Sequence, residues 1–260
     1  MSETDPLKTH VAGPIGWLVL DRPESRNALT RELWEAIPAK LEALAAEDGV
    51  RAVVITGTAG NFIAGADINE FRHLRSDPDL ARRYDQGAVE TIRVLERLPV
   101  PSIAMIGGPC LGGGCLIAFA CDLRIIAEKA FLGIPAGKLG LAYPHAAVER
   151  LVAVVGEATA LDLLLTGRFV YGPEAARLGL VQRCVSNEEL APRTEEWVGE
   201  IAKNAPLALR YARLAVRRRL GGVLTEQRAE ELVAACFASE DYREGVSAFL
   251  EKRAPHFRGR

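Results

Sequence analysis

Two glycine-rich loops carry the residues with the clearest potential for chemistry. The first loop, NFIAGADINEF at 61–71, follows the apolar run VVIT at 53–56. The second loop, GGPCLGGGCLIAFAC at 107–121, follows the apolar run SIAMI at 102–106 and leads into an apolar helix. Small residues around Gly65 leave the backbone open to a ligand, and a glycine-rich helix start exposes free N–H groups at the positive end of the helix dipole. The pattern predicts an anion or oxyanion site, and tight packing of a helix on a strand is the alternative.

Other common catalytic signatures are absent from the sequence. It contains no Gly-x-x-x-x-Gly-Lys phosphate loop, no Gly-x-Ser-x-Gly turn and no His-Glu-x-x-His motif. The four histidines are scattered along the chain, so we expect neither a metal site nor a metal cofactor. Cys115 follows the glycines of the second loop, but no base is near it in the sequence, so we expect it to pack in the core.

Short apolar runs alternate with helical patterns over most of the chain. The runs that predict strands are 16–20, 53–56, 102–106, 123–127 and 181–185. Thr30 can cap a helix with apolar residues at helical spacing, and a second helix is expected over 80–98. This alternation predicts an α/β fold with buried, mostly parallel strands. Beyond about residue 190 the pattern predicts three helices, with breaks near 204–206 and 221–222.

Composition and charge indicate a globular protein in a reducing compartment. The 260 residues are 49% hydrophobic and 25% charged, and their formal net charge is −2, so no global attraction to nucleic acid or anionic lipid is expected. The five cysteines form no Cys-x-x-Cys pair, which favours reduced thiols. The uncharged stretch 98–121 is long enough to span a membrane, but its prolines and glycines would leave backbone groups unpaired in lipid. We therefore expect a cytoplasmic protein without a membrane segment.

Eight short segments, spread over nearly the whole chain, form a specific set. They are RPESRNAL at 22–29, AGADI at 64–68, PVPSIAMIGGPCLGGGC at 99–115, CDLRI at 121–125, IPAGKLGL at 134–141, LLTGR at 164–168, GLV at 179–181 and FLEKRAPHF at 249–257. In order and spacing, this set resembles the enoyl-CoA hydratase/isomerase family, also called the crotonase superfamily.

The resemblance implies a fold, an assembly and a ligand. It implies a spiral of ββα units over about 1–195 and a C-terminal helical region over about 196–260 that forms homotrimers and often hexamers. The ligand would be a coenzyme A thioester, with no further cofactor, and the backbone N–H groups of Ala66 and Gly113 would hold the thioester oxygen as an enolate forms. Losing one such donor costs about 10²–10³ in rate. The other residues that the resemblance places around the substrate are Arg26, Ala28, Ala64, Asp67, Ile68, Asn69, Leu116 and Ala136.

Two positions depart from the pattern of the family's hydratases. Those enzymes carry one glutamate directly after GGGC and another after the proline of the next loop, and here the two positions are Leu116 and Ala136. Neither side chain can transfer a proton, so rapid hydration of an enoyl-CoA is not expected. In the nearby segment GLAYPHAA, Tyr143 or His145 could deliver a proton. The alternative is that Tyr143 packs in the acyl pocket and that His145 caps the following helix.

The resemblance therefore implies an acyl-CoA lyase or isomerase that stabilises a thioester enolate, in fatty-acid or related acyl-CoA metabolism. One alternative is an acyl-CoA decarboxylase or isomerase that uses Tyr143. Another is a protein without catalytic activity that binds acyl-CoA or RNA. Asp67 and Glu70 are weaker catalytic candidates, because Asp67 is expected to cap or anchor its loop and Glu70 to face solvent.

The C-terminal region raises two further expectations. Residues 203–219 contain six basic side chains, and no acid occurs from 201 to 225. This basic stretch could contact RNA, form a solvated face, pair with glutamates at 226–231, or help to hold coenzyme A phosphates; because only Tyr211 is interleaved, we do not expect nucleic acid as the partner. Apolar residues at 232–237 need a partner surface, which favours a trimer or a dimer of trimers.

Overall fold

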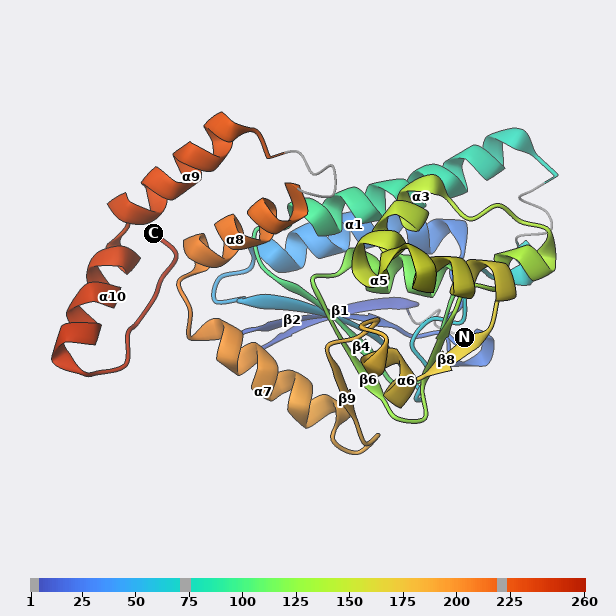
Figure 1. Cartoon of the computed structure of the whole chain (residues 1–260), viewed down its shortest axis with the longest axis horizontal. Coiled ribbons are helices and arrows are strands. Elements are labelled where there is room, and N and C mark those ends of the chain that lie inside the picture. The colour runs from blue at the N-terminus through green and yellow to red at the C-terminus, as the bar shows by residue number, and fades with distance from the viewer. Residues whose placement is uncertain (1–4, 71–75, 219–223) are drawn as a thin grey trace.

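A six-stranded sheet forms the centre of the protein in the computed structural model, which describes residues 5–70, 76–218 and 224–260 (Figure 1). Its strands, in spatial order, are β1 (Leu7–Ala12), β2 (Ile15–Leu20), β3 (Ala52–Gly57), β4 (Ser102–Ile106), β6 (Leu123–Ala127) and β9 (Arg183–Val185). β1 and β2 are antiparallel, and every other neighbouring pair is parallel. The prediction of an α/β fold with mostly parallel strands is therefore confirmed.

A second sheet of three short strands lies beside the first loop of the candidate site. Its strands are β5 (Pro109–Leu111), β7 (Phe131–Gly133) and β8 (Phe169–Tyr171), with β7 in the middle. The sequence did not predict these strands, because three residues are too few to show alternation of apolar and polar side chains.

Helices cover both faces of the six-stranded sheet. In chain order they are α1 (Arg31–Ala46), α3 (Pro78–Arg97), α4 (Gly113–Ala120), α5 (His145–Thr166), α6 (Gly172–Arg177), α7 (Leu190–Ala202), α8 (Pro206–Arg218), α9 (Glu226–Ala238) and α10 (Glu240–Glu251), with short 3-10 turns η1 (Pro23–Ser25) and η2 (Pro135–Leu139). Figure 1 shows α1 and α3 above the sheet and α7 below it. In the described part of the chain, no helix has the length and apolar character needed to cross a membrane.

The apolar patterns of the sequence explain this packing. β3 is buried along nearly its whole length, as expected for a parallel strand that is covered on both faces. Thr30 Oγ1 accepts a hydrogen bond from Leu33 N–H, as predicted for a cap, and the apolar positions of α1 face the sheet. The positions of α1 that are buried at helical spacing include Leu33, Ile37, Leu41 and Leu44.

The C-terminal region differs from the expected three helices. Four helices are described between 190 and 251, because Ser239 ends α9 and caps α10: its hydroxyl oxygen accepts a hydrogen bond from Tyr242 N–H (2.9 Å). The predicted break at 221–222 lies outside the described residues. α9 and α10 extend away from the sheet, at the opposite end of the molecule from α5 and β8 (Figure 1).

Candidate functional site

The two glycine-rich loops lie side by side and form the candidate site. They follow β3 and β4, which pair in parallel, so both loops leave the same edge of the sheet. Ile63 N–H donates a hydrogen bond to Pro109 O (3.0 Å), and Leu111 N–H donates to Ile63 O (2.9 Å). The loops therefore continue the parallel pairing beyond the ends of the two strands.

A third segment, around Leu29, completes the site. Leu29 N–H donates to Gly65 O (2.8 Å) and Leu29 O accepts from Asp67 N–H (2.9 Å), so Ala66 lies directly opposite Leu29. Gly113 lies against the Leu29 side chain, since a Cβ atom added to Gly113 would be 3.0 Å from Leu29 Cδ1. The structure thus brings Ala66 and Gly113 together around one leucine.

Among the residues that the structure describes, the backbone N–H groups of Ala66 and Gly113 have no acceptor. Gly113 is the first residue of α4, so its N–H has no partner within the helix. Across the described ranges, neither of these two N–H groups forms a hydrogen bond. The indole of Trp34, which is buried, also lies close to Gly113. Two free donors therefore stand in apolar surroundings, where hydrogen bonds to a developing negative charge are strongest.

Glycine is required where the loops approach each other. A Cβ atom on Gly114 would lie under 3.0 Å from Ile63 O, and one on Gly108 would lie still closer to Gly60 O. Real side chains do not tolerate such contacts with backbone atoms. The alternative interpretation of the glycines, tight packing, is therefore correct for Gly108 and Gly114, and it coexists with the free N–H of Gly113.

Tyr143 holds the turn that precedes α4. Its hydroxyl donates a hydrogen bond to Gly112 O (2.9 Å), and Gly112 N–H donates to Gly133 O (3.0 Å). Gly112 itself has a φ of 47°, in the region that favours glycine. Burial raises the pKa of the Tyr143 phenol well above 10. The phenolic proton is thus engaged with a backbone carbonyl, in the turn that presents Gly113.

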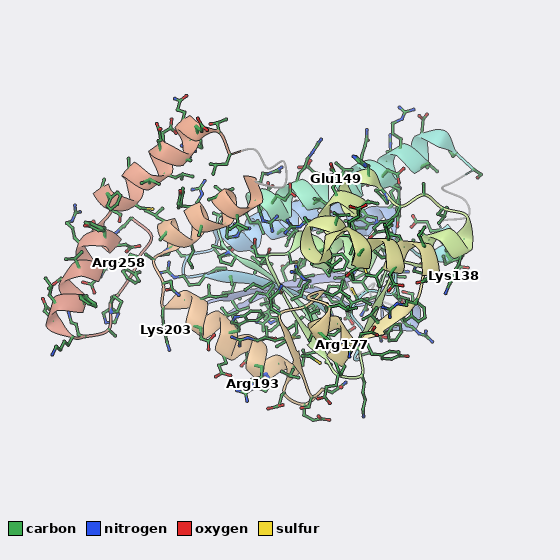
Figure 2. The ribbon with its side chains drawn as sticks, viewed as in Figure 1. Lys138, Glu149, Arg177, Arg193, Lys203 and Arg258 are labelled. Atoms are coloured by element: carbon green, nitrogen blue, oxygen red, sulfur yellow. The ribbon has the colours of Figure 1, made fainter. Side chains whose placement is uncertain are left out.

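His145 is exposed and lies close to a glutamate of its own helix. Its side chain is 87% exposed, and its Nε2 lies 3.5 Å from Oε1 of Glu149. Figure 2 labels Glu149, which lies on α5. The expectation that His145 caps the helix is wrong, because Pro144 occupies the cap position, no side chain caps this end and His145 is the first helical residue.

The two positions that differ from the hydratase pattern lie in apolar surroundings. Leu116 on α4 is 5% exposed, and Ala136 in η2 is half-buried against the core. The sequence contains no aspartate or glutamate at 98–121 or 130–148, the stretches that include α4, η2 and the turn at Tyr143. Any carboxylate of the site must therefore come from other segments.

The first loop supplies two carboxylates with different environments. Asp67 is bound to Arg22 Nη2 (2.9 Å) and also accepts a hydrogen bond from Asn69 N–H (3.2 Å), which confirms its predicted anchoring role. Glu70 does not simply face solvent, as the sequence led us to expect. It is half-buried and accepts a hydrogen bond from Arg31 N–H (3.0 Å) at the start of α1. Burial raises the pKa of Glu70 above its ordinary value.

The remaining predicted substrate residues lie on the first loop or next to it. Ala64 N–H donates to Arg26 O (3.1 Å), so these two segments are adjacent, and Ala28 is buried beside them. Ile68 and Asn69 are exposed. The structure therefore places the exposed side chain of Arg26 next to the backbone of the small residues of the first loop.

Cys115 packs in the core, as predicted. Its thiol donates to Cys110 O (3.0 Å) and lies 3.3 Å from Gly133 O, and all five cysteines are free thiols. Burial raises the pKa of the neighbouring Cys110 thiol, so it is protonated and inert at neutral pH. Among the described residues, no group of histidine, cysteine and acidic side chains is arranged to hold a metal ion.

Two residues of the basic stretch, Arg213 and Arg217, are used differently from any of the sequence interpretations, whereas Lys203 is exposed as expected for a solvated face. Arg213 and Arg217 are buried and bind Asp122, with Arg213 Nε 2.7 Å from Asp122 Oδ2 and Arg217 Nη2 2.8 Å from Asp122 Oδ1. They neither face solvent nor pair with the glutamates of α9, and they are not accessible to RNA. Arg219 lies outside the described residues. The sequence also gave no signal for Leu29 and Trp34 as neighbours of Gly113, because both look like ordinary core residues.

Comparison with known proteins agrees with this geometry. A family model described as enoyl-CoA hydratase/isomerase matches residues 12–260. The crotonyl-CoA hydratase of Syntrophomonas wolfei is 34% identical over 92% of this chain and 93% of that protein. The 2,3-dehydroadipyl-CoA hydratase of Escherichia coli is also 34% identical, over 94% of each chain.

A solved structure is similar over the entire chain. It is the crystal structure of an enoyl-CoA hydratase/isomerase family protein from Hyphomonas neptunium, with a TM-score of 0.94, 38% identity and full coverage of both chains. Sequence and structure comparisons therefore point to the same group of proteins.

Proposed function

Because the chain belongs to the enoyl-CoA hydratase/isomerase family and has its crotonase-like fold, we propose that it binds an acyl-CoA thioester and stabilises the enolate of that thioester. The N–H groups of Ala66 and Gly113 would donate hydrogen bonds to the thioester oxygen. The observation that carries this proposal is the pair of free donors gathered around Leu29. No metal or redox cofactor is needed for this chemistry.

The chemistry follows from where negative charge develops. When a bond at the α-carbon of a thioester breaks, the electron pair moves onto the thioester oxygen. Preorganised donors in an apolar site stabilise that oxygen without having to reorient. Two such donors account for enolate formation by proton removal, by decarboxylation or by double-bond migration, and the remaining groups decide which of these occurs.

We propose further that hydration of an unactivated enoyl-CoA is not the main reaction. Hydration requires a group that activates water and a group that protonates the α-carbon. Leu116 and Ala136 can do neither, and the segments around them contain no carboxylate. Each missing acid–base group costs about 10²–10⁴ in rate. The relatives named as hydratases support the substrate class for this chain, and not the reaction.

Decarboxylation or isomerisation is the second candidate, and the acid-free walls of the site favour decarboxylation, because isomerisation needs a base to move a proton. Decarboxylation needs no base: the bond to the carboxylate breaks, carbon dioxide leaves, and the enolate then takes a proton. Tyr143 could supply that proton only by giving up its bond to Gly112 O, and burial makes its phenol a weak acid. Glu70 is the ionisable carboxyl group of the first loop that is not bound to an arginine side chain.

Incubation with crotonyl-CoA and with methylmalonyl-CoA, each followed by mass spectrometry, tests these proposals. Carbon dioxide loss from methylmalonyl-CoA without rapid water addition to crotonyl-CoA would support a decarboxylase. Rapid hydration would overturn the proposal on reaction type. Tight binding of both thioesters without turnover would favour a binding protein, and calorimetry with no heat for any acyl-CoA would overturn the substrate class.

We also propose that the chain assembles as a trimer or a dimer of trimers through its C-terminal helices. Within one chain, Leu232 is covered, but Phe237, Phe249 and Leu250 remain exposed, the last two by 83% and 74%. These side chains belong to α9 and α10, which extend from the core (Figure 1). Exposed apolar surface of this kind marks an interface.

A further inference from the structure

The carbonyl groups of residues 118–121, at the C-terminal end of α4, each accept a hydrogen bond from an arginine side chain. The bonds join Arg124 Nη1 to Ala118 O (3.2 Å) and Cys121 O (3.0 Å), Arg150 Nε to Phe119 O (2.7 Å), and Arg217 Nη2 to Ala120 O (2.7 Å). We call Arg124, Arg150 and Arg217 the arginine cap. Helix ends normally satisfy these carbonyls with water or backbone groups, so three converging guanidinium groups are unusual.

The arginine cap is assembled from distant parts of the chain. Arg124 lies on β6, Arg150 on α5 and Arg217 on α8. Helix α8 also binds the C-terminal end of α3, because Arg213 on α8 donates hydrogen bonds to the carbonyl groups of Leu95 and Leu98. The C-terminal region therefore contributes directly to the two helices that pack behind the candidate site.

Positive charge is in excess around the cap. Asp122 binds Arg217 and Arg213, and Glu96 lies near Arg150, so two carboxylates face four arginines. Burial alone would raise the pKa of Asp122, but the charges of Arg213 and Arg217 outweigh this and hold it below its usual range. Burial lowers the pKa of Arg124 to about 10, which leaves it protonated at neutral pH. Within 5–70, 76–218 and 224–260, Arg217 Nη1 is a buried donor without a partner.

The opposite end of α4 carries Gly113. A helix of eight residues is about 12 Å long. The partial negative charge at the C-terminal end of the helix would weaken the binding of an anion at its N-terminal end. The arginines neutralise that partial charge. The guanidinium groups and the enolate oxygen each lie one hydrogen bond, about 3 Å, beyond the helix ends, so they are about 18 Å apart. At this distance and an effective dielectric constant of about 20, one unit charge changes the rate of forming an enolate by about fivefold.

We propose that the arginine cap positions and polarises α4, so that Arg217 and Arg150 act as positioning residues for the Gly113 N–H donor. This inference rests on the proposed enolate-stabilising function. It assigns to α8, in the C-terminal region, a second role besides assembly: Arg217 fixes the end of the helix that presents the donor.

The test uses the full chain with butyryl-CoA labelled with ¹³C at the thioester carbonyl, whose resonance moves downfield when the oxygen accepts hydrogen bonds. The variants are Arg217→Met and Arg150→Met, with Arg217→Lys as the conservative replacement. Arg243→Met is the matched control, because Arg243 Nη1 lies 3.4 Å from Ala238 O at the end of α9, which is not part of the site. Calorimetry gives the affinity of each folded variant.

We expect both methionine variants to lose about half or more of the downfield shift, with less than about threefold change in Kd, because most of the coenzyme A contacts are untouched. For the thioester that the wild-type protein converts, kcat of both methionine variants should fall about 5–30-fold, and KM should stay nearly unchanged. Arg217→Lys should recover part of the shift, and Arg243→Met should keep all of it.

Wild-type shifts in both methionine variants would overturn the proposal and leave the proposed function intact. If Arg217→Met does not fold, Arg150→Met decides alone, since Arg150 is only partly buried. If the wild-type protein binds butyryl-CoA without any carbonyl shift, the donors do not polarise the thioester, and the proposed function fails together with this inference.

Discussion

Gly114→Ala is the sharpest perturbation of the candidate site, because it separates the two loops without removing any functional group. A Cβ atom at this position would lie under 3.0 Å from Ile63 O and 3.0 Å from Ile63 Cβ. Ile63 O is backbone and is bound by Leu111 N–H at 2.9 Å, so it cannot rotate away as a side chain would. The loop that carries Ala66 must therefore move relative to α4 and Gly113.

The size of the effect follows from the two consequences of that movement. Forcing an extra methyl group into a packed contact costs about 1–3 kcal/mol of unfolding free energy. Moving one of two donors out of line with the thioester oxygen costs about 10²–10³ in kcat, because the donor must meet the oxygen within normal hydrogen-bond distance. The affinity for butyryl-CoA should fall much less, by about 2–10-fold, since one weakened hydrogen bond contributes about 0.5–1.5 kcal/mol.

The assay combines thermal unfolding, calorimetric binding of butyryl-CoA and the ¹³C resonance of its carbonyl. Gly199→Ala is the matched control, because Gly199 lies within α7 and a Cβ atom there would meet nothing within 4 Å. That control should be as stable as the wild-type protein or slightly more so. A folded Gly114→Ala protein with the full carbonyl shift and undiminished turnover would refute the assignment of the donors to Ala66 and Gly113.

Three further predictions address the supporting residues. Tyr143→Phe removes the bond to Gly112 O, so we expect about fivefold lower kcat with an unchanged pH profile. Loss of a basic limb would instead make the phenol a proton donor, because an acid is active only while it is protonated. Asp122→Asn should lower the free energy of unfolding by about 3–5 kcal/mol at pH 7 in urea titrations, because two arginines lose their buried partner. Since the pKa of Asp122 is lowered on folding, this difference should be complete above about pH 4 and shrink as the pH falls through the folded-state pKa. Replacement of Phe249 and Leu250 by aspartate should reduce the mass in light scattering from trimer to monomer, and an unchanged mass would exclude α10 from the interface.

Local patterns were sufficient to predict five of the six strands of the central sheet, whereas β1 was not predicted, because polar side chains interrupt its apolar residues. The strand at 53–56 and the cap at Thr30 depend on apolar runs and on a single side-chain hydrogen bond, which are visible in sequence. The small sheet of β5, β7 and β8 was missed, because its three-residue strands form only through long-range pairing. The split between α9 and α10 was missed as well, since a lone serine inside an apolar helical pattern is a weak signal.

The candidate site shows the same division between local and long-range information. The small residues of the two loops indicated exposed backbone donors, and the structure brings the corresponding residues together. The burial of Arg213 and Arg217 could not be foreseen, because their partner Asp122 is about 90 residues away in the sequence. A run of basic residues looks the same in sequence whether it faces solvent or neutralises helix ends.

The distribution of ionisable groups makes Glu70 the group that should govern the pH dependence of the reaction. Backbone donors do not titrate, and burial raises the pKa values of Tyr143 and Cys110 so that both stay protonated at neutral pH. Burial also raises the pKa of Glu70 above 4.5. If Glu70 moves protons as a base, kcat should fall as the pH drops through this raised pKa, because the carboxyl group then becomes protonated. Glu70→Gln should remove that acidic limb and lower kcat about 10²-fold, whereas Glu24→Gln, a change at an exposed glutamate on η1, should alter neither. A persistent acidic limb in Glu70→Gln would assign the titration to the substrate, as expected when the acyl group brings its own carboxylate.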